Sequence, residues 1–166
     1  WGGFACAGPG AQEQQTVLAE MEAKAKQAAA EAQSDRAEAE RGNVEAQAAL
    51  AERYATGRAV KMDLTQAAEW YRRAAEQGDA ESQYRLALLY DYGAGVSADP
   101  AQAVSWLRKA AGQGHVKAQR QMGVMYDYGF GVPPDRGEAA YWYRQAAERG
   151  DAQAQAALAA LYSGKA

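Results

Sequence analysis

The chain has 166 residues, of which 48% are hydrophobic and 23% charged, and its formal net charge at pH 7 is −3. This length is enough for one domain with a sizeable core. A single cysteine excludes an internal disulfide, and no run of about 18 apolar residues is present that would predict a transmembrane helix. The sequence lacks the basic clusters that nucleic-acid phosphates require, so nucleic acid is not expected as a partner.

Residues 1–10 form a glycine-rich segment that is predicted to be flexible. The triplet Ala5-Cys6-Ala7 has the small-x-small pattern that precedes a signal-peptidase cleavage site, so an export-signal remnant is one interpretation. A lipid anchor on Cys6 and a plain linker are the alternatives. On this basis an exported, periplasmic or envelope-associated location is favoured over a cytoplasmic one.

Residues 11–41 contain neither glycine nor proline and are rich in alanine, glutamate, glutamine and lysine, which predicts a helix. The end of this helix resembles the ending of later helices, so its C-terminal part is expected to cap the units that follow. The remainder of this helix either docks on a partner or is surrounded by solvent. The second alternative is open because a stripe of alanines buries little area. The apolar residues available for docking are Val17, Leu18 and Met21.

From residue 42 onward the chain repeats itself every 36 residues without insertions. Glycine, tyrosine, valine and tryptophan recur at fixed positions, beginning with Gly42, Tyr54, Val60 and Trp70. Such a period is typical of repeat architectures. It predicts three units at 42–77, 78–113 and 114–149, followed by a terminal helix at 150–166.

Each unit is predicted to form two helices. In the first helix, Ala46, Leu50 and Tyr54 make an apolar stripe at helical spacing. The second helix starts at a repeated aspartate, such as Asp63, which is expected to cap it, and carries Trp70 on its inner face. One hairpin of this size cannot bury its own tryptophan and tyrosine, so the units must stack, which predicts an all-α fold of the α-solenoid type.

The pattern resembles that of the Sel-one-like repeats, a family related to the tetratricopeptide repeats, and the match covers residues 42–162. Two positions depart from it: Ala59 stands where the second glycine of the turn belongs, and His115 replaces a helix-capping aspartate. The residues that carry the resemblance are clearest in the third unit. They are Ala118, Met122-Gly123, Tyr126, Gly129-Phe130-Gly131-Val132, Asp135, Ala139, Trp142 and Ala146-Ala147.

The resemblance implies a right-handed α-solenoid of paired antiparallel helices, with the long N-terminal helix as its cap. It also implies an interaction scaffold, commonly an adaptor or assembly factor and often exported in bacteria. Such scaffolds act through the concave face of the superhelix and have no active site of their own.

The residue types that catalysis or metal binding needs are not gathered in this sequence. The chain has one histidine and one cysteine, far apart, and no cluster of His, Cys, Asp or Glu with metal-ligand spacing. Asp91 and Asp127 each stand between two tyrosines, but paired catalytic acids need shielding that an open groove rarely supplies. No catalytic residue, metal or cofactor is therefore predicted.

A second stripe on the first helix of each unit is expected, by the resemblance, to line the concave groove. It is rich in tyrosine and arginine, the types that dominate binding hot spots. Arg85 and Arg120 are expected to form hydrogen bonds with a carboxylate or a peptide backbone. Leu88 and Val124 are apolar residues on a side that should be exposed to solvent. The alternative is that this stripe packs neighbouring first helices together. The predicted partner-binding residues are Tyr84, Arg85, Leu88, Asp91, Tyr92, Arg120, Gln121, Val124, Asp127 and Tyr128.

These observations predict a non-catalytic scaffold or adaptor that binds a peptide or protein segment in its concave groove. The alternative is an accessory structural subunit of a larger, membrane-associated complex, anchored by Trp1–Phe4 and the N-terminal helix.

Overall fold

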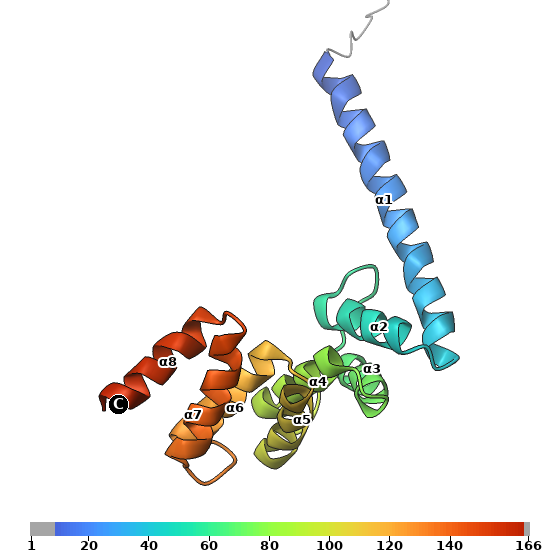
Figure 1. Ribbon diagram of the computed structural model, residues 1–166. Coiled ribbons are helices and arrows are strands. Elements are labelled where there is room, and N and C mark those ends of the chain that lie inside the picture. The colour runs from blue at the N-terminus through green and yellow to red at the C-terminus, as the bar shows by residue number, and fades with distance from the viewer. Residues whose placement is uncertain (1–8, 165–166) are drawn as a thin grey trace, which may run out of the picture.

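A computed structural model describes residues 9–164, which fold into eight α-helices and contain no strand. The helices are α1 (Pro9–Glu40), α2 (Val44–Thr56), α3 (Leu64–Glu76), α4 (Ala80–Tyr92), α5 (Pro100–Gly112), α6 (Val116–Tyr128), α7 (Arg136–Glu148) and α8 (Ala152–Ser163). In Figure 1, α2 to α8 follow one another in a curved row and α1 projects from one end of it. The predicted all-α solenoid is confirmed.

Two of the sequence-based interpretations concern residues beyond this range. The signal remnant or lipid anchor at Cys6, and the docking segment Trp1–Phe4, both lie outside the described residues. Within the described part of the chain, no helix has the length and apolar character needed to cross a lipid bilayer.

Each second helix begins at the repeated aspartate. The Oδ1 atom of Asp63 accepts hydrogen bonds from the backbone N–H groups of Thr65 and Gln66, both at 3.0 Å. Asp135 caps α7 in the same way, and Asp99 caps α5 by accepting the backbone N–H of Gln102. These bonds satisfy N–H groups that have no partner within the helix, so the position of each helix start follows from local chemistry.

The repeated tryptophans pack inside the solenoid. Trp70 and Trp106 are only 6% and 9% exposed, and the half-buried Trp142 packs against the same core. The centre of that core is made by one position of three successive first helices, occupied by Leu50, Leu86 and Met122. Each unit therefore covers the apolar side chains of the next one, as stacking requires.

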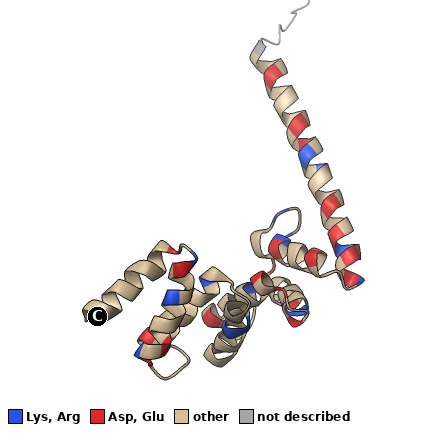
Figure 2. Ribbon diagram, viewed as in Figure 1, with Lys and Arg blue, Asp and Glu red and all other residues tan. Residues whose placement is uncertain are grey.

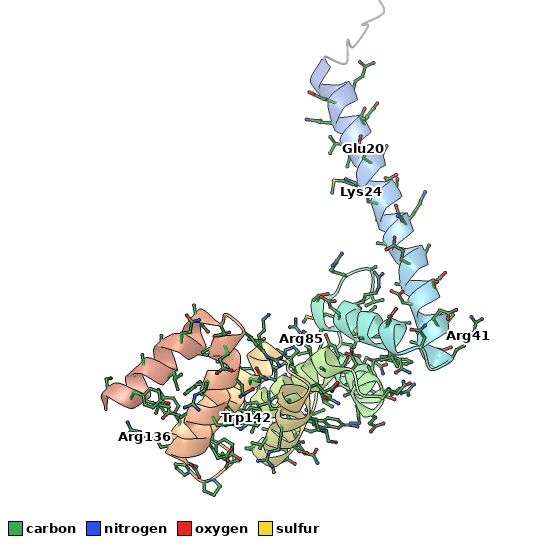
Figure 3. All side chains as sticks on the ribbon, viewed as in Figure 1. Glu20, Lys24, Arg41, Arg85, Arg136 and Trp142 are labelled. Atoms are coloured by element: carbon green, nitrogen blue, oxygen red, sulfur yellow. The ribbon has the colours of Figure 1, made fainter. Side chains whose placement is uncertain are left out.

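The C-terminal turns of α1 take the place of a second helix in front of α2. Ala32 and Ala39 are buried there, and the Nε atom of Arg53 in α2 lies 2.7 Å from the Asp35 carboxylate. The rest of α1 is exposed. Figure 3 shows Glu20 and Lys24 on this projecting part, away from the other helices.

A repeated pair of arginine and tyrosine joins each unit to the next. The Nη2 atom of Arg72 in α3 donates to the Tyr90 hydroxyl in α4 at 2.7 Å. The same bond recurs one unit later from Arg108 to Tyr126 at 2.8 Å. The repeated tyrosine therefore fills the core with its ring and fixes the angle between units with its hydroxyl.

A repeated glutamine closes the C-terminal end of each second helix. Gln83 donates through Nε2 to the Ala75 carbonyl at 3.1 Å, and its Oε1 accepts a bond from Gln113 at 2.8 Å. Gln113 also donates to the Gly78 carbonyl at 2.9 Å, and one unit later Arg149 keeps only the equivalent of that bond, to the Gly114 carbonyl. Among the described residues, no donor reaches the buried Oε1 of Gln119.

Replacing Arg149 by glutamine is expected to stabilise the protein by about 1 kcal/mol, since the new amide can donate to Gln119 as Gln113 donates to Gln83. Urea denaturation followed by circular dichroism measures this difference. The control Gln113→Ala removes the existing bonds to Gln83 and to the Gly78 carbonyl and should destabilise the protein. An Arg149→Gln protein that is no more stable than the wild type would show that the Gln119 oxygen carries no penalty.

Candidate peptide-binding groove

The ten residues predicted to bind a partner lie on one side of α4 and α6. We call this side, together with the equivalent side of α8, the groove face. The two arginines on this face are already paired within the protein. The Arg85 Nε atom lies 2.6 Å from Oε1 of Glu81 on the same helix, and Arg120 Nη1 lies 2.8 Å from Oδ2 of Asp151, the residue that caps α8. Because both guanidinium groups have carboxylate partners, neither is free to capture another carboxylate without breaking an existing pair. The Glu81–Arg85 pair has the i,i+4 spacing of a helical ion pair, whereas the pairing of Arg120 spans 31 residues and is not marked in the sequence.

His115 links the second and third units on the groove face. Its Nδ1 atom accepts the backbone N–H of Ala118 at 3.2 Å, so the histidine caps α6 as an aspartate would. Its Nε2 atom lies 2.7 Å from Oε2 of Glu81, and its ring stacks on Tyr84 with the ring centroids 4.8 Å apart. Although burial raises the pKa of Glu81, hydrogen bonds from His115 and Arg85 outweigh that effect and hold the pKa below its usual value.

The two apolar residues of the groove face have different environments. Val124 packs against the C-terminal core cluster around Tyr143, so its apolar character is explained by contacts within the chain. Leu88, its equivalent one unit earlier, is half-buried and lies outside both described core clusters. Gln121 is also half-buried. The alternative that this stripe serves internal packing therefore holds for Val124.

Two tyrosines on the groove face are strongly exposed. Tyr92 and Tyr128 are 76% and 66% exposed, and the ring of Tyr128 stacks on Phe130 with a centroid separation of 5.8 Å. Asp91 and Asp127, which precede them, are half-buried. The C-terminal ends of α4 and α6 therefore each present a carboxylate beside an exposed aromatic ring.

A cavity of about 270 Å³ lies where the groove face meets the end of the solenoid. Its wall includes Asp127 and Tyr128 from α6, and Arg136 and Tyr143 from α7. The α8 side consists of Ala157, Ala160 and Leu161. The Arg136 guanidinium donates a hydrogen bond to the Leu161 carbonyl, and Figure 3 shows Arg136 beside the end of α8.

Tyr143 is held in this cavity by two neighbours. Its hydroxyl donates to Oδ2 of Asp127 at 3.4 Å, and its ring lies directly on Gly123, where an added Cβ would come within 2.4 Å of the ring. Burial and the adjacent negative charge of Asp127 raise the pKa of Tyr143 well above its ordinary value. Tyr143 is therefore a neutral hydrogen-bond donor that orients the Asp127 carboxylate.

A family model described as Sel1 repeat matches residues 44–79, 80–115 and 116–151. The chain belongs to the Sel1 repeat family. Sel1 repeats generally mediate protein–protein interactions, and the family is in general a non-catalytic scaffold. A comparison with curated proteins found no match.

Two solved structures share this Sel1 repeat fold. One is a protective antigen of uropathogenic Escherichia coli strains that displays an SLR fold, with a TM-score of 0.76 and 40% identity over 78% of this chain. The other is a Sel1 repeat protein from Oxalobacter formigenes, with a TM-score of 0.68 and 42% identity over 70% of this chain. The matches cover only 28% and 47% of those two proteins, so this chain corresponds to part of each.

Three residues of the second helices were not predicted from the sequence: Arg136 and Tyr143 of α7, which line the cavity, and the buried Tyr71 of α3. Tyr71 and Tyr143 occupy the same position of the first and third units, directly after the repeated tryptophan, where the second unit has Leu107. Burial, reinforced by the nearby carboxylates of Glu52 and Glu81, raises the pKa of Tyr71 to about 12 although Arg85 opposes the shift. The Trp-Tyr pairs can be seen in the sequence and could have indicated the two tyrosines, but nothing in the sequence marks Arg136.

Within residues 9–164, no group of three or more His, Cys, Asp or Glu side chains could hold a metal ion. The residues proposed for N-terminal docking, Val17, Leu18 and Met21, are 51%, 58% and 62% exposed on the projecting part of α1.

Proposed function

We propose that this chain is a non-catalytic scaffold that binds a peptide or protein segment along the groove face, with the cavity at the α6–α8 end as its anchor point. The observation that carries the proposal is the cavity itself, whose wall includes the Tyr128 ring, exposed over 66% of its area. A volume of about 270 Å³ is small for a whole ligand and suits one inserted side chain. Family membership supports a protein partner.

The proposal is tested by selecting binders from a random peptide library on the immobilised protein and measuring their Kd by fluorescence anisotropy. Truncating Tyr128 to alanine is expected to weaken binding by about 1–2 kcal/mol, roughly five- to thirtyfold in Kd, because exposed tyrosines beside a pocket act as hot spots. Tyr141→Ala is the matched control, since Tyr141 is 49% exposed on α7 and does not line the cavity. Selected peptides that bind both variants as tightly as the wild type would contradict the proposal.

A second candidate function is an accessory subunit of a larger complex, held through α1. The exposed Val17, Leu18 and Met21 on a helix that extends beyond the solenoid favour it. Deleting residues 1–27 spares the buried turns of α1 at Ala32 and Ala39. Under this alternative, the truncated protein melts like the full chain and still binds groove peptides, but no longer assembles with its complex.

A further inference from the structure

We infer that the cavity at the α6–α8 end takes a cationic side chain, a lysine or an arginine, of the bound segment. The inference rests on the proposed function and names the chemistry of its anchor point. Three features of the cavity carry it: the carboxylate of Asp127, which has no ion-pair partner in the described part of the chain, the two tyrosine rings beside it and the small residues on the α8 side of the wall.

The first argument is the balance of charge on the groove face. Arg85 and Arg120 are paired with Glu81 and Asp151, so their charges are compensated within the chain. Asp127 has no cationic partner within 4.0 Å among residues 9–164, although it is half-buried. A partly desolvated carboxylate without a counter-charge favours a ligand that brings one. Figure 2 shows that α8, which borders the cavity, carries no charged residue.

Neither Arg136 on the cavity wall nor Lys117 on α6 supplies that charge. Arg136 lines the cavity, but its guanidinium donates to the Leu161 carbonyl at the end of α8, where helix carbonyls carry a partial negative charge. Lys117 lies on the same helix as Asp127, but ten residues earlier, which places it about 15 Å away along the helix. Asp127 therefore remains available to a cation that enters from solvent.

The second argument is the aromatic wall. Tyr128 and Tyr143 both line the cavity, and the faces of such rings attract cations. The Tyr143 hydroxyl donates to Oδ2 of Asp127 and leaves the other carboxylate oxygen free to accept from an ammonium or guanidinium group. The aliphatic stem of a lysine or arginine can pack on Ala157 and Ala160.

The third argument is that the residues around the cavity differ in size and type from their equivalents one unit earlier. Asp91 and Tyr92 are the equivalents of Asp127 and Tyr128 one unit earlier. There the positions of Ala157 and Ala160 are taken by the larger Gln121 and Val124, and the position of Tyr143 by Leu107. The α6–α8 end thus combines a cavity, two aromatic rings and a carboxylate. We therefore expect a cationic side chain to bind there and not one unit earlier.

The test is a double-mutant cycle in which Kd is measured for a lysine-containing peptide from the random-library selection. One change replaces the lysine of the peptide by norleucine, and the other is Asp127→Asn in the protein. We expect the selected pool to be enriched in lysine and arginine. Either single change should weaken binding roughly tenfold, and the second change should add little once the first is made. Glu148→Gln, an exposed carboxylate near the opposite end of α7, is the matched control and should leave Kd unchanged.

The failures of the two proposals are distinguishable. If Tyr128→Ala weakens binding but the pool lacks basic residues, or the two changes in the cycle are additive, the cationic specificity is wrong and the groove proposal stands. If no peptide is selected, or binding ignores Tyr128→Ala, both are wrong. Asp127→Asn keeps an oxygen that can accept from Tyr143, and an unchanged melting temperature would show that the variant is folded.

Discussion

Replacing Trp106 by alanine is expected to lower the free energy of unfolding by about 3–5 kcal/mol, because a large buried ring is lost and the surrounding helices cannot close the gap. Trp106 is 9% exposed in the middle unit, within the core that also contains Leu86 and Met122, and the Lys109 ammonium lies 4.1 Å from the centroid of its ring. The core cluster that contains Trp106 runs through all three units, so the loss should also reduce the cooperativity of unfolding between units. Urea denaturation followed by circular dichroism and by tryptophan fluorescence measures both effects.

Tyr92→Ala is the control for that experiment. Tyr92 is a repeated aromatic residue in the same unit, but it is 76% exposed, so its loss should change stability by less than about 0.5 kcal/mol. If Trp106→Ala cost no more than Tyr92→Ala, the assignment of the repeated tryptophan to the core would be wrong.

Replacing Gly95 by alanine is expected to cost about 2–4 kcal/mol, from two effects that act together. Gly95 has a φ of +73°, in the left-handed region that side chains disfavour. An added Cβ would also come within 2.2 Å of the Leu64 carbonyl oxygen and 2.7 Å of the Thr65 nitrogen. Both are backbone atoms at the start of α3, which cannot turn aside as a side chain could. Thermal and urea denaturation of the variant measure the loss.

Ala59 provides the matched comparison, because it is the equivalent of Gly95 in the first unit. It adopts a φ of 63°, so the same left-handed turn is made there by an alanine. Ala59→Gly should relieve that backbone cost and stabilise the protein by about 0.5–1 kcal/mol. Were Gly95→Ala to cost less than about 1 kcal/mol, the close approach of this turn to α3 would not persist in solution.

Much of the architecture could be predicted because its causes are local or periodic. The cap at Asp63 depends on residues two and three positions away, and the stripe of Ala46, Leu50 and Tyr54 depends on helical spacing. The 36-residue period then required stacking, since one hairpin cannot cover Trp70. The departure at His115 was visible but unexplained until the structure placed Glu81 and Tyr84 beside it.

The candidate site was predictable only in part. Tyr128 and Asp127 were found from their register on the first helix, and both line the cavity. The pairing of Arg120 with Asp151 spans 31 residues and depends on how one unit leans on the next. The pairing of Arg85 with Glu81 has the i,i+4 spacing of a helical ion pair, but no pattern along the chain reveals the pairing of Arg120.

The amino-acid sequence by itself determined the helical hairpins, their number, their caps and the order in which they stack. These follow from hydrogen bonds within a few residues and from a repeat that leaves each hairpin unable to bury its own rings. Only the tertiary structure decided which charges of the groove face are already neutralised and where a cavity remains. Those properties arise between helices that are distant in the sequence, where a change from Gln121 to its equivalent Ala157 opens a space that no local pattern marks.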